Sequence, residues 1–197
     1  MALLLALTRR VAEGDRLVRR RDRWRLAPTF MLGSGLAGKT LGIVGYGRIG
    51  REVGRLAEAF GMHVIRTRRT ALEDLLSTAD VVSIHVPLSD ETRHLIDAAA
   101  LRRMKPTAVL VNTSRGPVVD EAALVAALDS GELAGAALDV FEHEPDVHPD
   151  LLGREDVVLT PHLGSATSEA REGMGMLVVD ALRAVLLEGR EPENVVR

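Results

Sequence analysis

Short, mainly apolar segments recur along this chain and alternate with segments of helical character. The apolar segments are LGIV (41–44), MHVIR (62–66), VVSIHV (81–86), AVLVNT (108–113), GAALDV (135–140) and VVLT (157–160). Between them lie segments such as EAALVAALDS (121–130), with the composition of helices. Strands that are apolar on both faces are typical of a parallel sheet covered by helices on each side. The sequence therefore predicts an α/β fold with a doubly wound parallel sheet.

Length and composition fit one globular domain. With 197 residues, 46% of them hydrophobic, the chain can bury a sizeable core. The formal net charge of −3 argues against nucleic acid as a partner, and the absence of cysteine excludes disulfides and cysteine-based metal sites. The apolar start MALLLAL is far shorter than the roughly 20 residues that span a bilayer, and it lacks the features of a signal peptide. We therefore expect a cytoplasmic protein without membrane contact.

Both ends of the chain are expected to be helical. Apolar residues at helical spacing predict a first helix that reaches about Arg20: they are Leu3, Leu4, Leu7, Val11, Leu17 and Val18. We interpret the arginines between residues 19 and 25 as a solvated helix face. A Gly- and Pro-rich loop follows over residues 28–38. A brief helix is expected around 72–76 and a long last helix over about 165–187.

The sequence GSGLAGKT (33–40) matches the phosphate-loop pattern of nucleoside triphosphatases. Such a loop must leave a strand and open a helix, because its amides and the helix N-terminus together bind phosphate. Here the order is reversed, since a polar stretch precedes the motif and Thr40 opens an apolar strand. We therefore predict that these residues do not form a triphosphate site.

The turn GYGRIG (45–50) has the required context, with strand LGIV before it and the helical segment 51–60 after it. In a dinucleotide-binding turn, Gly45 permits the tight turn, Gly47 admits the pyrophosphate and Gly50 lets helix and strand pack closely. We predict a Rossmann-like dinucleotide-binding domain over residues 1–197. Its parts are a helix and loop (1–36), the core (37–164) and a C-terminal helix (165–190).

The end of the next strand bears on the choice of dinucleotide. An acidic residue about 20 positions after the Gly-rich turn would bind the adenosine ribose of NAD. This chain has Arg66, Thr67, Arg68 and Arg69 in that region, and Arg68 stands where the carboxylate is expected. Guanidinium groups bind a 2′-phosphate in bidentate fashion. The sequence thus favours NADP, with NAD possible, while the alternative is that these arginines only cap an exposed strand end.

Three later motifs each place one ionisable side chain beside Gly or Pro: NTSRGPVVDE (112–121), DVFEHEP (139–145) and LTPHLGSAT (159–167). They supply Arg115, Glu144 and His162 after successive predicted strands. Open α/β sheets bind ligands at the carboxyl ends of their strands. An arginine, a carboxylate and an imidazole at that edge form a plausible acid/base site beside a dinucleotide.

Together with the Gly-rich turn, these motifs resemble the cofactor domain of the D-isomer-specific 2-hydroxyacid dehydrogenases. The resemblance implies hydride transfer between a nicotinamide cofactor and a small 2-hydroxy or 2-keto acid. In it, Arg115 corresponds to the substrate-binding arginine, His162 to the general acid/base and Glu144 to its carboxylate partner. A guanidinium fork suits a 2-keto acid, which carries its carboxylate and carbonyl on adjacent carbons.

The resemblance also implies further cofactor contacts. Arg48 and Ile49 correspond to positions against the pyrophosphate, and Pro87 to one beside the adenine and ribose. Asp139, Gly164 and Ser165 correspond to positions around the nicotinamide. Thr113 and Ser114 precede the catalytic arginine, and His85 falls near the cofactor.

Other histidines are weaker candidates. Glu142, His143, Glu144 and His148 lie close in sequence, but they lack the helical spacing of a zinc site and Pro145 interrupts them. We predict no metal site. His94 is likewise only a weaker candidate.

The family pairs through this domain, and an uncovered apolar stripe of Leu3, Leu4, Leu7 and Val11 would favour a homodimer. The resemblance further implies a preceding substrate domain of about 100 residues that this sequence does not contain. It also implies a helix and a strand after Arg69 that are largely absent from this sequence, so we expect one edge of the sheet to be shortened. The alternative to a dehydrogenase is therefore a non-catalytic dinucleotide-binding or dimerisation module derived from such an enzyme.

Overall fold

The computed structural model describes residues 1–67, 72–192 and 195. The chain divides into two compact units, Met1–Pro161 and His162–Arg197, and each is described by itself. The first unit contains the sheet, and the second contains the last helix.

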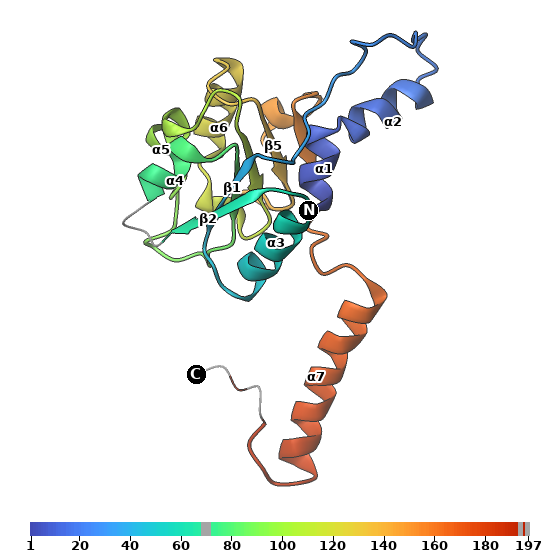
Figure 1. Ribbon diagram of the computed structural model, residues 1–197. Helices are drawn as coiled ribbons and strands as arrows, with labels where there is room; N and C mark the ends of the chain where they lie inside the picture. The colour runs from blue at the N-terminus through green and yellow to red at the C-terminus, as the bar shows by residue number, and fades with distance from the viewer. Residues whose placement is uncertain (68–71, 193–194, 196–197) are drawn as a thin grey trace. The chain divides into compact units, whose positions relative to one another are not determined.

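A six-stranded parallel sheet forms the centre of the first unit (Figure 1). Its strands are β1 (Thr40–Val44), β2 (His63–Thr67), β3 (Val81–Ile84), β4 (Val109–Asn112), β5 (Gly135–Leu138) and β6 (Val157–Leu159). They lie in the order β2-β1-β3-β4-β5-β6, and every neighbouring pair is parallel. The order reverses between β1 and β3, which is where open α/β sheets bind ligands. The predicted α/β fold with a doubly wound sheet is confirmed, and its strands are the apolar segments of the sequence.

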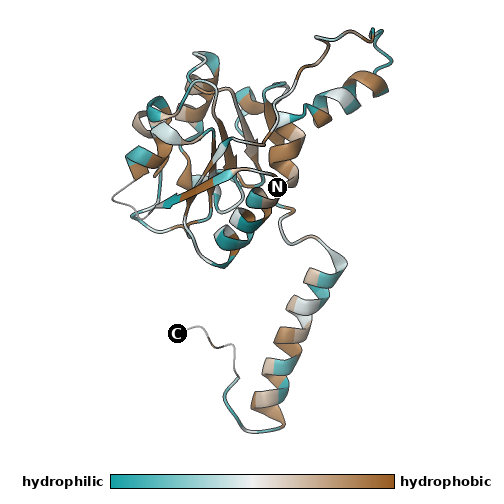
Figure 2. Ribbon diagram, viewed as in Figure 1, coloured by the Kyte–Doolittle hydropathy of each residue, from teal (hydrophilic) through white to brown (hydrophobic). Residues whose placement is uncertain are grey.

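Helices cover both faces of this sheet. On one side lie α1 (Ala2–Thr8) and α3 (Arg48–Ala59); on the other lie α4 (Leu72–Thr78), α5 (Ala98–Arg103) and α6 (Glu121–Asp129). Each face has its own apolar cluster, and successive strand residues alternate between the two. Leu110 packs in the cluster under α4 to α6, whereas Val111 packs in the cluster under α1 and α3. Most strand residues are consequently apolar, as the brown inner strands in Figure 2 show, whereas the edge strand β2 is partly polar.

The predicted first helix is in fact two helices, α1 and α2 (Val11–Arg19). Arg10, which separates them, has a left-handed backbone with φ of 53°. The carbonyl of Thr8 does not continue the helix, because it accepts a hydrogen bond of 2.7 Å from the N–H of Ser34. A contact with a distant segment therefore ends α1, and the spacing of apolar residues could not reveal it.

The expectation of an uncovered stripe on the opening helix is wrong for most of its residues. Leu4 and Leu7 are buried in the cluster with Leu41 and Ala137, and Leu3 is partly buried against it. The stripe covers the chain's own sheet, because α1 packs on β5 and β6. Val11 remains exposed, with 57% of its surface accessible.

Two other expectations concern the segments around β1 and β2. Thr40 begins β1, so GSGLAGKT leads into a strand and lacks the geometry of a phosphate loop, as predicted. In the described part of the chain β2 forms one edge of the sheet. The shortening of that edge after Arg69 stays a prediction, because residues 68–71 lie outside the described residues.

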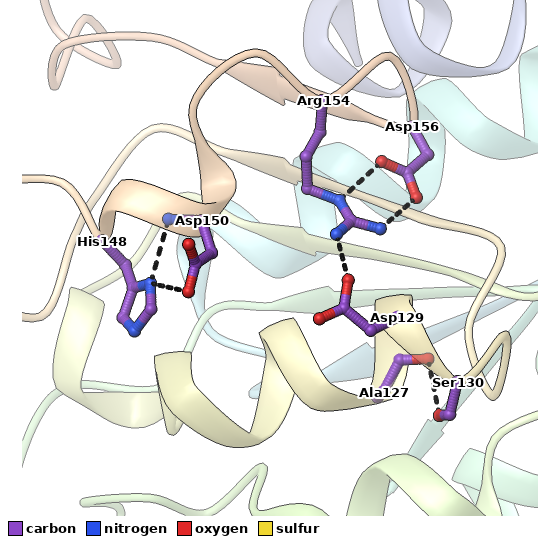
Figure 3. Close-up of polar contacts among 7 residues, drawn as sticks. All are labelled: Ala127, Asp129, Ser130, His148, Asp150, Arg154 and Asp156. Atoms are coloured by element: carbon purple, nitrogen blue, oxygen red, sulfur yellow. Dashed lines mark hydrogen bonds and ion pairs between the residues drawn. The ribbon is translucent and has the colours of Figure 1, made fainter.

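The guanidinium group of Arg154 fixes the segment that leads into β6 (Figure 3). The Nε and Nη2 atoms of Arg154 each donate to Asp156 at 2.8 Å, and its Nη1 donates to Asp129 at the end of α6 at 2.5 Å. These hydrogen bonds, first of all those to Asp156, raise the pKa of Arg154 above its ordinary value. Bidentate pairing of this kind adds geometric precision as well as energy.

The second unit contains α7 (Ser168–Leu186), close to the predicted 165–187. The hydroxyl of Thr167 caps it by accepting a hydrogen bond of 3.2 Å from the N–H of Ala170. Among the described residues, no helix has the length and apolar character needed to cross a membrane.

Candidate functional site

The Gly-rich turn joins β1 to α3 at the reversal of strand order. Gly45 has a φ of +94°, and a Cβ there would lie 2.7 Å from the carbonyl carbon of His85. A Cβ on Gly50 would lie 2.3 Å from the carbonyl oxygen of Gly45. Both positions therefore require glycine, which agrees with the roles predicted for a tight turn and a close helix–strand contact.

The start of α3 is open. Gly47 is its N-cap and contributes no side-chain hydrogen bond, and a Cβ on Gly47 would meet no atom within 4 Å. Arg48 and Ile49 are the first two helical residues, and Ile49 is 68% exposed. The first N–H groups of a helix lack partners within the helix and attract anions. The turn thus fits the pyrophosphate of a dinucleotide.

The end of β2 brings a cation to this turn. The guanidinium carbon of Arg66 lies 4.3 Å from the centre of the Tyr46 ring, a cation–π contact. Arg68, on which the predicted preference for NADP depends, lies outside the described residues.

His85 follows β3 and lies behind the Gly-rich turn. Its Nε2 lies 2.9 Å from the hydroxyl oxygen of Ser83. Burial lowers the pKa of His85 to about 4, so the ring is neutral at neutral pH. Pro87, two residues further on, accepts a hydrogen bond of 2.6 Å from the Thr92 hydroxyl through its carbonyl. These contacts order the segment that the resemblance placed beside the cofactor.

Hydrogen bonds shape the turn after β4. The buried side chain of Asn112 donates to the carbonyl of Arg115 at 3.0 Å and accepts from the N–H of Ser114 at 3.0 Å. The Ser114 hydroxyl accepts from the N–H of Arg115, and the Ser114 carbonyl accepts from Nη1 of Arg115, both at 2.6 Å. Thr113 is partly buried in the same turn. Arg115 itself is exposed at the carboxyl edge of the sheet.

The acidic residues that follow Arg115 are engaged with other groups. Asp120 caps α6 by accepting from the N–H of Ala123 at 2.9 Å, and Glu121 accepts from the N–H of Glu142 at 2.7 Å. The interpretation of Arg115 as a helix-terminal residue paired with these carboxylates therefore loses its support.

The loop after β5 lies against the Arg115 turn. A Cβ on Gly116 would lie 1.8 Å from the carbonyl oxygen of Phe141, so the two backbones are in close contact. The carboxylate of Glu144 accepts a hydrogen bond of 3.1 Å from the N–H of Phe141. At the head of this loop the buried Asp139 accepts from the Thr160 hydroxyl at 2.5 Å. The structure thus brings together the loops that carry Arg115, Asp139 and Glu144.

His162, Gly164 and Ser165 belong to the second unit. His162 has a left-handed backbone with φ of 53°. The placement of these residues beside Arg115 and Glu144 stays a prediction. Within residues 1–67, 72–192 and 195, no three or more His, Asp or Glu side chains are grouped to hold a metal ion.

Sequence reasoning missed one part of this edge. His94, which the sequence offered only as a weaker candidate, contacts Glu142 in the Glu144 loop at 2.6 Å. The two residues are 48 positions apart, and no local pattern in the sequence signals their contact.

Comparisons with known proteins identify the family. Residues 1–164 match the family model of the D-isomer specific 2-hydroxyacid dehydrogenase, NAD binding domain. Over 99% of its length the chain is 48% identical to a glyoxylate reductase of Thermococcus litoralis and covers 64% of that relative. It is 49% identical to a glyoxylate reductase of Aeropyrum pernix, with the same shares of each chain covered.

Solved structures agree. A crystal structure of a protein from Thermus thermophilus matches the whole chain with a TM-score of 0.93 at 47% identity, and the chain covers 66% of it. An NADPH-dependent glyoxylate/hydroxypyruvate reductase of Sinorhizobium meliloti, in complex with NADP and malonate, matches 95% of the chain with a TM-score of 0.86 at 37% identity. The chain covers 62% of that protein.

The chain thus spans about two thirds of the length of the relatives that it matches. The matched region includes the Gly-rich turn and the loops of Arg115 and Glu144. This chain belongs to the D-isomer-specific 2-hydroxyacid dehydrogenase family, of which it carries the NAD-binding domain.

Proposed function

We propose that this chain is the cofactor-binding part of an NAD(P)-dependent oxidoreductase that interconverts small 2-keto and 2-hydroxy acids. The observation that carries the proposal is the close contact of Gly116 with Phe141, which holds the Arg115 and Glu144 loops together at the carboxyl edge of the sheet. The open start of α3 lies at the same edge, after β1. The names of the relatives, glyoxylate reductases among them, support this class of substrate.

Three side chains carry the proposed chemistry. Arg115 binds the substrate carboxylate with its forked donors and stabilises charge that develops on the carbonyl oxygen. His162 donates a proton to that oxygen during reduction and removes it during oxidation. Glu144 orients the imidazole through a hydrogen bond to the ring. The bound dinucleotide supplies or accepts the hydride.

The proposed cofactor preference is NADPH over NADH. Arg66, stacked on Tyr46 at the end of β2, and the sequence neighbours Arg68 and Arg69 offer guanidinium groups to a 2′-phosphate. The relative from Sinorhizobium meliloti was solved with NADP. Arg68→Asp is expected to abolish or reverse the preference, since each lost phosphate contact costs about 1.5–3 kcal/mol. Fluorescence titration with both cofactors tests this, and equal affinities in the unaltered chain would contradict it.

A homodimer is also proposed, on a surface that shares only Val11 with the stripe that the sequence suggested. Around α2 and the loop after it, large apolar side chains are exposed: Val11, Val18, Trp24, Leu26 and Leu32, with Leu26 93% accessible. Trp24 and Phe30 stack with their ring centres 6.1 Å apart. Exposed apolar patches of this kind mark interfaces. Sedimentation at micromolar concentration is expected to show a dimer, and a monomer would contradict the proposal.

The 197-residue chain by itself is expected to bind the dinucleotide but to turn over 2-keto acids poorly. Hydride transfer needs the substrate held at near-attack distance in a site closed from water, and a misplacement of about 1 Å already costs on the order of 10²-fold in rate. Arg115 and Glu144 form one wall of that site. The relatives are longer by about a third of their length, which would supply the opposite wall.

The experiment measures NADPH consumption with glyoxylate, hydroxypyruvate and pyruvate, with and without an added substrate domain. Turnover that appears only with the added domain and is lost in His162→Ala supports the proposal. Ordinary rates from the chain alone would contradict the expected poor turnover. Dinucleotide binding without turnover in either form would instead favour the non-catalytic module. A single domain over residues 1–197 and a cytoplasmic location stay predictions.

A further inference from the structure

His94 holds an unusual position between β3 and α5. Its backbone is left-handed, with φ of 49°, a region that Asn, Asp and His tolerate better than most residues. Its Nε2 lies 2.6 Å from Oε1 of Glu142, and its Nδ1 lies 3.9 Å from Oδ2 of Asp120. An ionised carboxylate only accepts hydrogen bonds, so Nε2 carries the hydrogen and donates it to Glu142. The side chain of Glu142 is 16% exposed and that of His94 is 39% exposed, so the bond is partly buried on its carboxylate side.

The backbone around His94 is fixed to the segment that follows Arg115. The N–H of His94 donates to the carbonyl of Pro117 at 2.8 Å, and the N–H of Ile96 donates to the carbonyl of Val118 at 3.1 Å. The N–H of Asp120 returns a hydrogen bond of 3.1 Å to the carbonyl of Ile96. The backbone that carries the imidazole is therefore already hydrogen-bonded to the segment after the Arg115 turn.

Glu142 extends the connection to α6. Its Oε2 accepts from the N–H of Glu121 at 3.3 Å, while its own N–H donates to Oε1 of Glu121 at 2.7 Å. Glu121 is 5% exposed. The three side chains of His94, Glu142 and Glu121, which we call the His94 staple, thus join the segments after β3, β4 and β5.

The His94 staple lies directly behind the two proposed catalytic loops. Glu142 follows Phe141, whose carbonyl is in close contact with Gly116 and whose N–H binds the Glu144 carboxylate. Gly116 in turn follows Arg115. If the staple loosened, the peptide that joins Phe141 to Glu142 could move away from Gly116, and the distance between Arg115 and Glu144 would no longer be fixed.

We propose that His94 is a positioning residue for the reaction, which acts through Glu142 to hold the Glu144 loop against the Arg115 turn. The inference rests on the proposed function, because it assigns His94 a role relative to Arg115 and Glu144. Sites that bind or react need their groups held within about 0.5 Å, and supporting hydrogen bonds supply that precision. The Gly-rich turn lies outside this connection, so the pyrophosphate contacts of the dinucleotide do not depend on it.

Two substitutions at position 94 separate positioning from folding. His94→Asn keeps a residue that tolerates the left-handed backbone, but its side chain is too short to reach Glu142. His94→Gln restores an N–H donor at the reach of Nε2. His148→Asn is the control, because the Nδ1 atom of His148 accepts from the N–H of Asp150 at 3.3 Å and its side chain forms no hydrogen bond with the staple (Figure 3). Glu142→Gln tests the same connection from the other side, should His94→Asn fail to fold.

The readouts are amide hydrogen exchange, NADPH affinity, and the affinity for oxalate, a two-carbon dicarboxylate that mimics glyoxylate, in the presence of NADPH. In His94→Asn we expect exchange at Phe141, Glu142 and Glu121 to accelerate, and oxalate affinity to fall, each by about tenfold, as the loss of a hydrogen bond to a charged group implies. NADPH affinity is expected to stay within about twofold. His94→Gln should recover most of the loss, and His148→Asn should change none of the three.

The outcomes distinguish failure of this inference from failure of the proposed function on which it rests. With the added substrate domain present, an unaltered chain that binds NADPH but no oxalate would overturn the proposed function, and the inference with it. Suppose that the unaltered chain binds oxalate and that His94→Asn binds it equally well although its amide exchange accelerates. His94 would then be a structural residue only, and the inference alone would be overturned. Exchange unchanged in His94→Asn would mean that the staple does not hold the loop, which also overturns it.

Discussion

Two turns in this molecule perform the same task, since each takes the chain from a parallel strand into a helix, yet they are built in opposite ways. The turn after β1 is made of glycines, and its helix α3 starts at Gly47 without a side-chain cap. The turn after β4 is held by the side chains of Asn112 and Ser114, and its helix α6 is capped by Asp120.

The difference separates two ways of binding an anion. An uncapped helix start leaves backbone N–H groups free for a phosphate, and small residues let that phosphate approach. In the turn after β4 the helix N–H groups are already engaged, so the anion must be bound by a side chain, Arg115. The first turn therefore suits a pyrophosphate, and the second suits the carboxylate of a small acid.

The substitution with the largest predicted effect disrupts the second turn. In Gly116→Ala the new Cβ would lie 1.8 Å from the carbonyl oxygen of Phe141, and the two backbones must separate. We expect a loss of about 3 kcal/mol in the free energy of unfolding, at the upper end for overpacking. Urea denaturation measures it, with Gly35→Ala as the control, because a Cβ on Gly35 meets no atom within 4 Å. Equal effects of the two substitutions would show that the loops are not in close contact.

The next prediction concerns how the free energy of unfolding depends on pH through His85, which lies beside the first turn. Burial lowers the pKa of His85 from 6.5 to about 4. Above pH 7 the ring is neutral in both the folded and unfolded chain, but as the pH falls from 6.5 towards 4 the unfolded chain binds the proton first. The free energy of unfolding therefore decreases, and His85 contributes about 2 kcal/mol of that decrease between pH 7 and pH 5.

Urea denaturation at pH 7, 6 and 5 checks this when the unaltered chain is compared with His85→Gln. Any difference between the two at pH 7 serves as the reference. Relative to it, the variant should gain about 2 kcal/mol at pH 5. Parallel pH dependences would mean that the ring takes up a proton in the folded state as readily as in the unfolded chain.

The third prediction concerns a substitution that gives the helix of the first turn a side-chain cap like that of the second. In Gly47→Asp the N-cap of α3 would gain a carboxylate that can accept from the helix N–H groups, as Asp120 does in α6. Stability should rise by a few tenths of a kcal/mol, whereas NADPH affinity should fall by at least about tenfold through charge repulsion. The opposite signs make the test decisive. Unchanged NADPH affinity, measured by fluorescence, would mean that the pyrophosphate does not bind at this helix start.

The same contrast explains how much of the molecule could be predicted from its sequence. The strand, the glycines and the helix of the first turn lie within about 20 consecutive residues, so their pattern was sufficient to predict the turn and the parallel sheet. The staple was not predictable, because His94 and Glu142 are distant in sequence and DVFEHEP contains two glutamates with nothing to distinguish their partners. The break at Arg10 was missed for a similar reason, since a hydrogen bond from Ser34 causes it.

The smallest predicted effect tests what the cap itself contributes to the second turn. Asp120 accepts a hydrogen bond of 2.9 Å from the N–H of Ala123, and its other oxygen lies 3.9 Å from Nδ1 of His94. Asp120→Ala should lower the free energy of unfolding by about 1 kcal/mol, the usual value of an N-cap. Asp120→Asn keeps an acceptor for the cap and removes only the charge, and partly exposed charge pairs contribute between about 0 and 1 kcal/mol. We therefore expect Asn to recover most of the loss in urea denaturation. If Asn were as destabilising as Ala, the carboxylate would stabilise the turn through its charge near His94, and the capping hydrogen bond would not be what closes the start of α6.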